Sequence, residues 1–128
     1  MKLRKYRPEY RQELFRLADA DFFSADLLLS GGARIENACF YFQQTVEKAL
    51  KAALVHLEIE FPSVHDHAVL LALLPNTEPS CPFQHELSEL NIYAAQRRYE
   101  EGPAPATVED AKSARNMAEA VLRWSKNL

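Results

Sequence analysis

Glycine is scarce in this chain. Only three glycines occur among 128 residues, and two of them are the adjacent Gly31 and Gly32. No stretch alternates apolar and polar residues between hairpin signals, so β-strands are not expected. Between the few stretches that contain glycine or proline, apolar residues recur with the helical period. The sequence therefore predicts an all-α protein.

Cysteine is also rare, and long apolar runs are absent. The two cysteines, Cys39 and Cys81, match no Cys-x-x-Cys spacing and are expected to be reduced thiols. No apolar run reaches the roughly 18 residues that a membrane span requires. Residues 1–12 lack the apolar core of a signal peptide. We therefore expect a cytoplasmic protein without membrane association.

The length suits a single domain, residues 1–128, in which residues 1–8 form a basic N-terminal arm. The net charge of −3 hides an asymmetry, because residues 1–16 carry six cations and two acids, a net charge of +4, which leaves −7 for the remainder. The cations are Lys2, Arg4, Lys5, Arg7, Arg11 and Arg16. A basic arm can bind RNA phosphates by counterion release, or it can be a solvated terminus.

Five helices are predicted from the apolar period and the punctuation between them. Their ranges are 8–30, 33–58, 66–74, 82–99 and 107–125. Capping boxes are predicted at Ser63 with Asp66 and at Thr107 with Asp110. In the last two helices we expect a set of apolar side chains to point inward: Phe83, Leu87, Leu90, Ala94 and Val108. The order of long and short helices is typical of an up-and-down helical bundle.

The second predicted helix interrupts its apolar pattern with five polar residues. They are Gln43, Gln44, Glu47, Lys48 and Lys51. Glu47 and Lys51 form an i,i+4 pair in the favourable order, which alone would explain a solvated face. Two adjacent amides on a central helix instead suggest a polar surface that meets a phosphate or a second subunit.

Asp21 falls within the apolar stripe of the first predicted helix. A carboxylate there needs a cationic or hydrogen-bonding partner, because burying it alone is costly. Lys48, Lys51 or an arginine near the C-terminus would supply the positive charge. We expect Asp21 to have a structural polar role.

Two other segments contain residue types that bind ligands. Two histidines, His65 and His67, flank Asp66 and at first suggest a metal site. A further ligand at a spacing usual for zinc is missing, so no metal is expected. Arg97 and Arg98 precede Tyr99 near the end of the fourth predicted helix. They are either a helix cap or a contact to a phosphate and a base.

Several of these motifs together resemble the HEPN domain family over nearly the whole chain. They are Ala18-x-x-Asp21-x-x-x-Ala25-x-x-Leu28-Leu29, Ala38-Cys39-Phe40-x-x-Gln43-Gln44-x-x-Glu47-Lys48-Ala49-Leu50-Lys51-Ala52, Pro62-x-x-His65-Asp66, Leu70-Leu71 and Tyr93-x-x-x-x-Arg98-Tyr99. The resemblance implies a bundle of about five helices that forms homodimers. In bacteria and archaea such proteins are often encoded beside a minimal nucleotidyltransferase, as a toxin–antitoxin-like pair.

HEPN ribonucleases carry an arginine followed, after four to six residues, by a histidine on a late helix. Here the last histidine is His85, and no arginine lies within seven residues before any of the four histidines. We therefore expect a non-catalytic homodimer that binds a nucleotide or a nucleotidyltransferase, and no cofactor beyond such a nucleotide. One alternative is a ribonuclease toxin with a non-standard site at His65, Asp66 and Arg98, and another is a purely structural dimerisation module. The residues expected to bind ligand or partner are Gln43, Gln44, Glu47, Lys48, Lys51, His65, Arg97, Arg98 and Tyr99.

Overall fold

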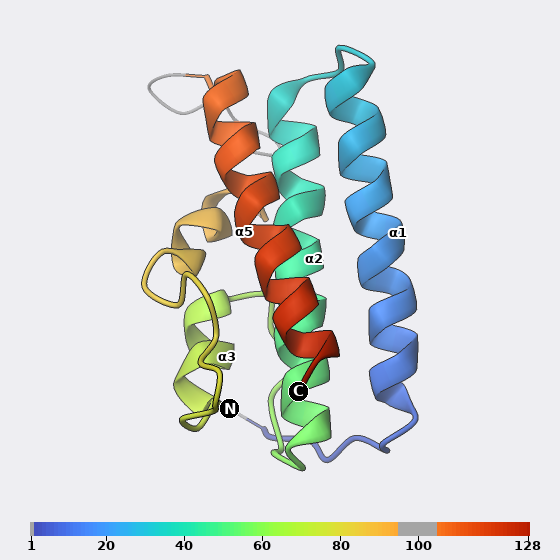
Figure 1. The fold of residues 1–128 in the computed structure, drawn as a ribbon, viewed down its shortest axis with the longest axis vertical. Helices are drawn as coiled ribbons and strands as arrows, with labels where there is room; N and C mark the ends of the chain where they lie inside the picture. The colour runs from blue at the N-terminus through green and yellow to red at the C-terminus, as the bar shows by residue number, and fades with distance from the viewer. Residues whose placement is uncertain (1, 95–104) are drawn as a thin grey trace.

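The computed structural model of the chain describes residues 2–94 and 105–128 (Figure 1). In order, the elements are the α-helices α1 (Tyr10–Ser30), α2 (Ile35–His56) and α3 (His67–Leu73), the 3₁₀ helix η1 (Leu87–Tyr93) and the α-helix α5 (Val108–Lys126). The only β pairing within the described ranges is an isolated bridge between Arg4 and Phe61. The protein is an all-α helical bundle.

Helices α1 and α2 form a long antiparallel pair, and α5 packs along α2 (Figure 1). The chain reverses between the first two helices at Gly31 and Gly32. Gly32 has a φ of +77°, a conformation that glycine adopts without strain, and the amide of Gly31 donates to the carbonyl of Leu27. These two glycines therefore end α1 and start the reversal.

Helix α2 is the central element and contacts each of the other helices. Small side chains fill much of the space between α1, α2 and α5, and all of the following are fully buried: Ala18, Ala25, Ala38, Ala49, Ala53, Ala111, Ala114 and Ala118. Larger buried residues, such as Phe42 and Leu50, fill the remaining volume. The alanines let three helix backbones approach closely, which explains why α2 is buried on nearly every side.

The predicted fourth helix, 82–99, is wrong in its type and its start. Residues 82–86 form turns, the helix is 3₁₀ and begins at Leu87, and residues 95–99 lie outside the described residues. Pro82 precedes Phe83, which has a φ of +55°, a value incompatible with a right-handed helix. Phe83 is consequently exposed, although Leu87 and Leu90 are buried as predicted.

Of the two predicted capping boxes and the predicted inward position of Val108, the structure confirms one capping box. The capping box at Thr107 and Asp110 is confirmed, with both reciprocal hydrogen bonds present. The box at Ser63 is wrong, because Asp66 itself is the N-cap of α3 and accepts from the amide of Ala68. Val108 is exposed, since it is the first residue of α5 and lies outside the helix contacts.

The bundle has no membrane-spanning element within residues 2–94 and 105–128, because none of these helices is both long and apolar enough to cross a bilayer.

Candidate functional site

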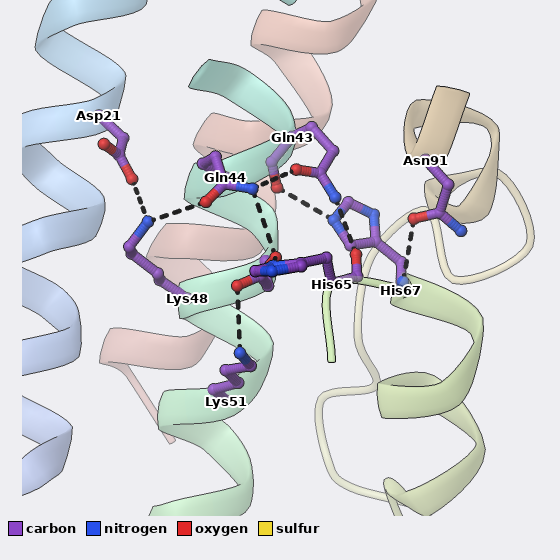
Figure 2. Close-up of polar contacts among 9 residues, drawn as sticks. Asp21, Gln43, Gln44, Lys48, Lys51, His65, His67 and Asn91 are labelled. Atoms are coloured by element: carbon purple, nitrogen blue, oxygen red, sulfur yellow. Dashed lines mark hydrogen bonds and ion pairs between the residues drawn. The ribbon is translucent and has the colours of Figure 1, made fainter. Parts of the chain in front are cut away.

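A network of polar side chains lies on the side of α2 that faces away from α5, between α1 and the segment that leads into α3 (Figure 2). Helical spacing aligns Gln44, Lys48 and Lys51 on this face of α2 and brings Gln43 and Glu47 beside them. Gln43 and Glu47 are buried, whereas the other three are half-buried. This face is therefore more than a solvated helix surface.

Gln43 fastens the segment between α2 and α3 to the central helix. Its Nε2 donates to the carbonyl of His65 at 2.9 Å, and its Oε1 accepts from Nε2 of Gln44 at 2.7 Å. Its backbone carbonyl lies 3.0 Å from Nε2 of His67. A buried amide needs such partners, and here they fix the position of two histidines.

Glu47 is the acidic centre of the network. Its Oε1 lies 2.9 Å from Nδ1 of His65 and 3.3 Å from Nε2 of Gln44, and its Oε2 lies 3.1 Å from Nζ of Lys51. The Glu47 side chain is only 5% exposed, so these contacts compensate a carboxylate that has lost most of its hydration.

The imidazole of His65 is held at one nitrogen and open at the other. Its side chain is 75% exposed, although Nδ1 contacts the buried carboxylate of Glu47. Because a carboxylate only accepts hydrogen bonds, Nδ1 carries a proton. In the neutral ring, Nε2 is then a free acceptor, and it has no hydrogen bond to a described residue.

Asp21 on α1 is joined to α2 by Lys48. The two charged groups lie 2.5 Å apart, each side chain is 18% exposed, and Nζ of Lys48 also donates to Oε1 of Gln44 at 3.3 Å. Lys48 is thus the partner of Asp21 among the cations considered from the sequence. Through it the network runs without a break from α1 to His65 (Figure 2).

The charges of the network nearly cancel. Asp21 and Lys48 form one ion pair, and Glu47 and Lys51 form another. His65 is the remaining ionisable member, so the face is neutral with His65 neutral and carries one positive charge with His65 protonated. The face therefore offers hydrogen-bonding groups with little excess charge, and the 75% exposed His65 is its most accessible side chain.

His67 is fully buried beneath this face and contacts two further elements. Its Nδ1 lies 2.8 Å from the carbonyl of Leu87, its Nε2 reaches the carbonyl of Gln43, and its amide donates to Oδ1 of Asn91. Burial lowers the pKa of His67, and the two carbonyl contacts oppose this effect only in part. The structural role of His67 and Asn91 was missed from the sequence, although a histidine in an otherwise apolar slot was a signal.

Asp66 stabilises the start of α3 and forms no hydrogen bond with the imidazole of His65. Its Oδ1 accepts from the amide of Ala68 at 2.9 Å and from Nδ2 of Asn91 at 2.7 Å. The acid that contacts His65 is therefore Glu47. No group of three metal-ligating side chains converges anywhere in the described ranges.

Arg97, Arg98 and Tyr99, which the sequence suggested as phosphate and base contacts, lie outside the described residues. The structure brings together the other six residues of the predicted binding set with Asp21: Gln43, Gln44, Glu47, Lys48, Lys51 and His65.

The fold and this face define an all-α domain with a polar network on its central helix, and the comparisons agree on the fold. The family model described as HEPN domain matches residues 11–128. The crystal structure of an archaeal HEPN homologue is similar, with 30% sequence identity, a TM-score of 0.67, and coverage of 91% of this chain and 95% of that one. A comparison with curated proteins found no match. The chain belongs to the HEPN family.

Proposed function

We propose that this HEPN protein is a non-catalytic homodimer that binds a nucleotide, a partner nucleotidyltransferase or both, in a toxin–antitoxin-like pair. The carrying observation is the exposed imidazole of His65, which the buried carboxylate of Glu47 orients at the surface. Lys51 and Gln44 lie beside the same carboxylate, so hydrogen-bond donors are gathered around one acidic centre.

The ligand that suits this face is an oxyanion of modest charge. A phosphate oxygen or a partner carboxylate accepts from protonated Nε2 of His65, and charge-assisted hydrogen bonds of this kind are among the stronger ones in proteins. Because Lys48 and Lys51 are already paired with carboxylates, they support the ligand by orientation more than by excess charge. The absence of the arginine–histidine motif supports binding without cleavage.

Calorimetry of the purified protein against ATP, GTP and the protein encoded next to it tests this proposal. Wild-type protein should release heat with at least one of them. His65→Ala should weaken that binding roughly 10- to 100-fold, the effect of one hydrogen bond to a charged group. His85→Ala removes another exposed histidine, which forms no hydrogen bond or ion pair with the network, and should change the affinity less than about 2-fold. No heat with any of the three ligands would refute the proposal.

The homodimer is tested separately by sedimentation at several protein concentrations. A mass of two chains that persists upon dilution supports it. A mass of one chain throughout the concentration range contradicts this part of the proposal and leaves the ligand test standing.

A ribonuclease is the second candidate, and one observation favours it. A histidine held by a carboxylate at Nδ1 and open at Nε2 is arranged as a general base is, and it could take a proton from a ribose 2′-hydroxyl. Incubation with total cellular RNA distinguishes the candidates. Cleavage by wild type that His65→Ala abolishes would establish the enzyme, whereas intact RNA at high protein concentration would remove it.

A further inference from the structure

The end of the bundle at which α1 begins and α5 ends carries a group of cations that the site on α2 does not use. Lys2, Arg4, Lys5 and Arg7 are all exposed, and none of them forms an ion pair with a described residue. Residues 2–8 run across this end of the molecule, past the end of α2 and on to the start of α1 (Figure 1).

This basic segment is fixed to the bundle. The backbone of Arg4 exchanges two hydrogen bonds with Phe61, at 3.0 and 3.1 Å. The ring of Tyr6 stacks on Tyr10 and on Phe61, with centroid distances of 5.0 and 4.4 Å. The cations are therefore displayed from an anchored backbone, which lowers the entropy lost when a ligand orders them.

A groove of about 440 Å³ lies between the start of α1 and the end of α5. It is lined by Arg11, Gln12, Phe15, Arg16, Asp19 and Lys126. Arg16 is paired with Glu13, and Lys126 is paired with Asp19 at 2.7 Å.

Arg11 is the cation of this groove without a carboxylate. Its guanidinium lies 4.8 Å from the ring centre of Phe15 and donates to the carbonyl of Ser125 at 3.3 Å. Its Nε is buried and has no acceptor among the described residues. The excess charge of the groove therefore comes from Arg11.

Few acids balance this end. Glu9, Glu58 and Glu60 are the exposed carboxylates near it that form no ion pair with a described residue, against five cations that have no acidic partner: Lys2, Arg4, Lys5, Arg7 and Arg11. The excess is positive here even though the chain as a whole carries −3. A concentrated positive surface on an acidic protein attracts polyanions to one place.

We propose that this basic end binds the phosphate backbone of a nucleic acid. A membrane surface would need exposed apolar residues among the cations, and only Leu3 of the large exposed apolar side chains lies in this segment. A phosphate chain needs only spaced cations and a groove, and both are present. The inference is independent of the proposed function, because it uses no residue of the network on α2.

Fluorescence anisotropy with labelled 12-mers of single-stranded RNA, single-stranded DNA and duplex DNA, from 50 to 300 mM salt, tests it. Wild type should bind at least one of them, with affinity that falls steeply with salt. Lys5→Gln combined with Arg7→Gln removes two charges, which should reduce the magnitude of the log–log salt slope by about 1.4 for a single strand and weaken binding on the order of 25-fold near 0.1 M salt.

Lys112→Glu is the matched control, because it also lowers the net charge by two, at an exposed site near the start of α5. It should leave the salt slope unchanged. Equal weakening by both variants would overturn the proposal in favour of a net-charge effect, and so would an absence of binding to all three oligonucleotides. Binding to anionic vesicles but to no oligonucleotide would assign the surface to a membrane instead. Circular dichroism at each salt concentration verifies that the variants are folded.

Discussion

Glu47 on α2 and His65 on the segment before α3 are 18 positions apart in sequence and 2.9 Å apart at Oε1 and Nδ1. The carboxylate is buried and the imidazole is exposed, so the pair joins the core of the bundle to its surface. Because Oε2 of the same carboxylate holds Lys51, one glutamate positions an imidazole and an ammonium group.

Glu47→Gln should therefore destabilise the fold as well as the surface. The amide keeps the shape of the side chain but leaves the half-buried ammonium of Lys51 without its carboxylate. We expect a loss of roughly 1–3 kcal/mol in the free energy of unfolding, the typical cost of an uncompensated buried group. Urea denaturation at neutral pH measures it.

Glu109→Gln provides the comparison for that measurement. Glu109 pairs with Lys112 on α5, but both side chains are largely exposed, so the substitution should cost less than about 0.5 kcal/mol. Equal effects of the two substitutions would mean that Glu47 is not structurally central.

His67 should make the stability of the protein depend on pH. Burial lowers its pKa below the ordinary value of 6.5, so the folded state binds this proton less tightly than the unfolded chain does. The free energy of unfolding is unaffected by His67 well above pH 6.5. It falls as the pH drops through that value, by at most about 1.4 kcal/mol per pH unit, until the folded-state pKa is reached.

Urea denaturation at pH 7.5, 6.5 and 5.5 tests this prediction on wild type and on His67→Gln. Glutamine cannot titrate, and the other three histidines remain in both proteins. The wild type should lose more stability between pH 7.5 and 5.5 than the variant does. Parallel pH profiles would show that His67 is not the responsible group.

The helical period of apolar residues was enough to predict α1, α2 and α5, because α1 and α5 each bury one face against α2, and the apolar stripe of α2 is widened by its further contacts. It failed for residues 82–86, where the positive φ of Phe83 ends any α-helix and the chain turns before η1. Sequence spacing cannot report a backbone conformation of this kind.

Some contacts of the candidate site could be predicted from the sequence, and others could not. The Glu47–Lys51 contact follows from i,i+4 spacing within one helix and is present at 3.1 Å. The contacts of Gln43 and Glu47 to His65 depend instead on where the chain returns after α2, which local periodicity does not encode. The choice of Lys48 as the partner of Asp21 depends likewise on the register between α1 and α2.

A double-mutant cycle measures the Asp21–Lys48 pair. Asp21→Ala, Lys48→Ala and the double variant should give a coupling of about 1–2 kcal/mol in the free energy of unfolding, because both side chains are largely removed from water. Asp19 and Lys126 offer a matched pair, since they also join α1 to another helix but are 54% and 41% exposed. Their coupling should stay below about 1 kcal/mol. A cycle in which the exposed pair couples more strongly would contradict the burial argument.

Asp66 and Ser63 give the sharpest test of how α3 begins. Asp66→Ala removes the acceptor for the amide of Ala68 and for Nδ2 of Asn91, so it should cost roughly 1–2 kcal/mol, as the loss of an N-cap does. Ser63→Ala removes an exposed hydroxyl that caps nothing, and it should change stability by less than about 0.5 kcal/mol. Because the helix has only seven residues, its first turn cannot compensate for a lost cap, and hydrogen exchange at Ala68 should increase in the Asp66 variant alone. Faster exchange at Ala68 in Ser63→Ala would place the cap at Ser63 after all.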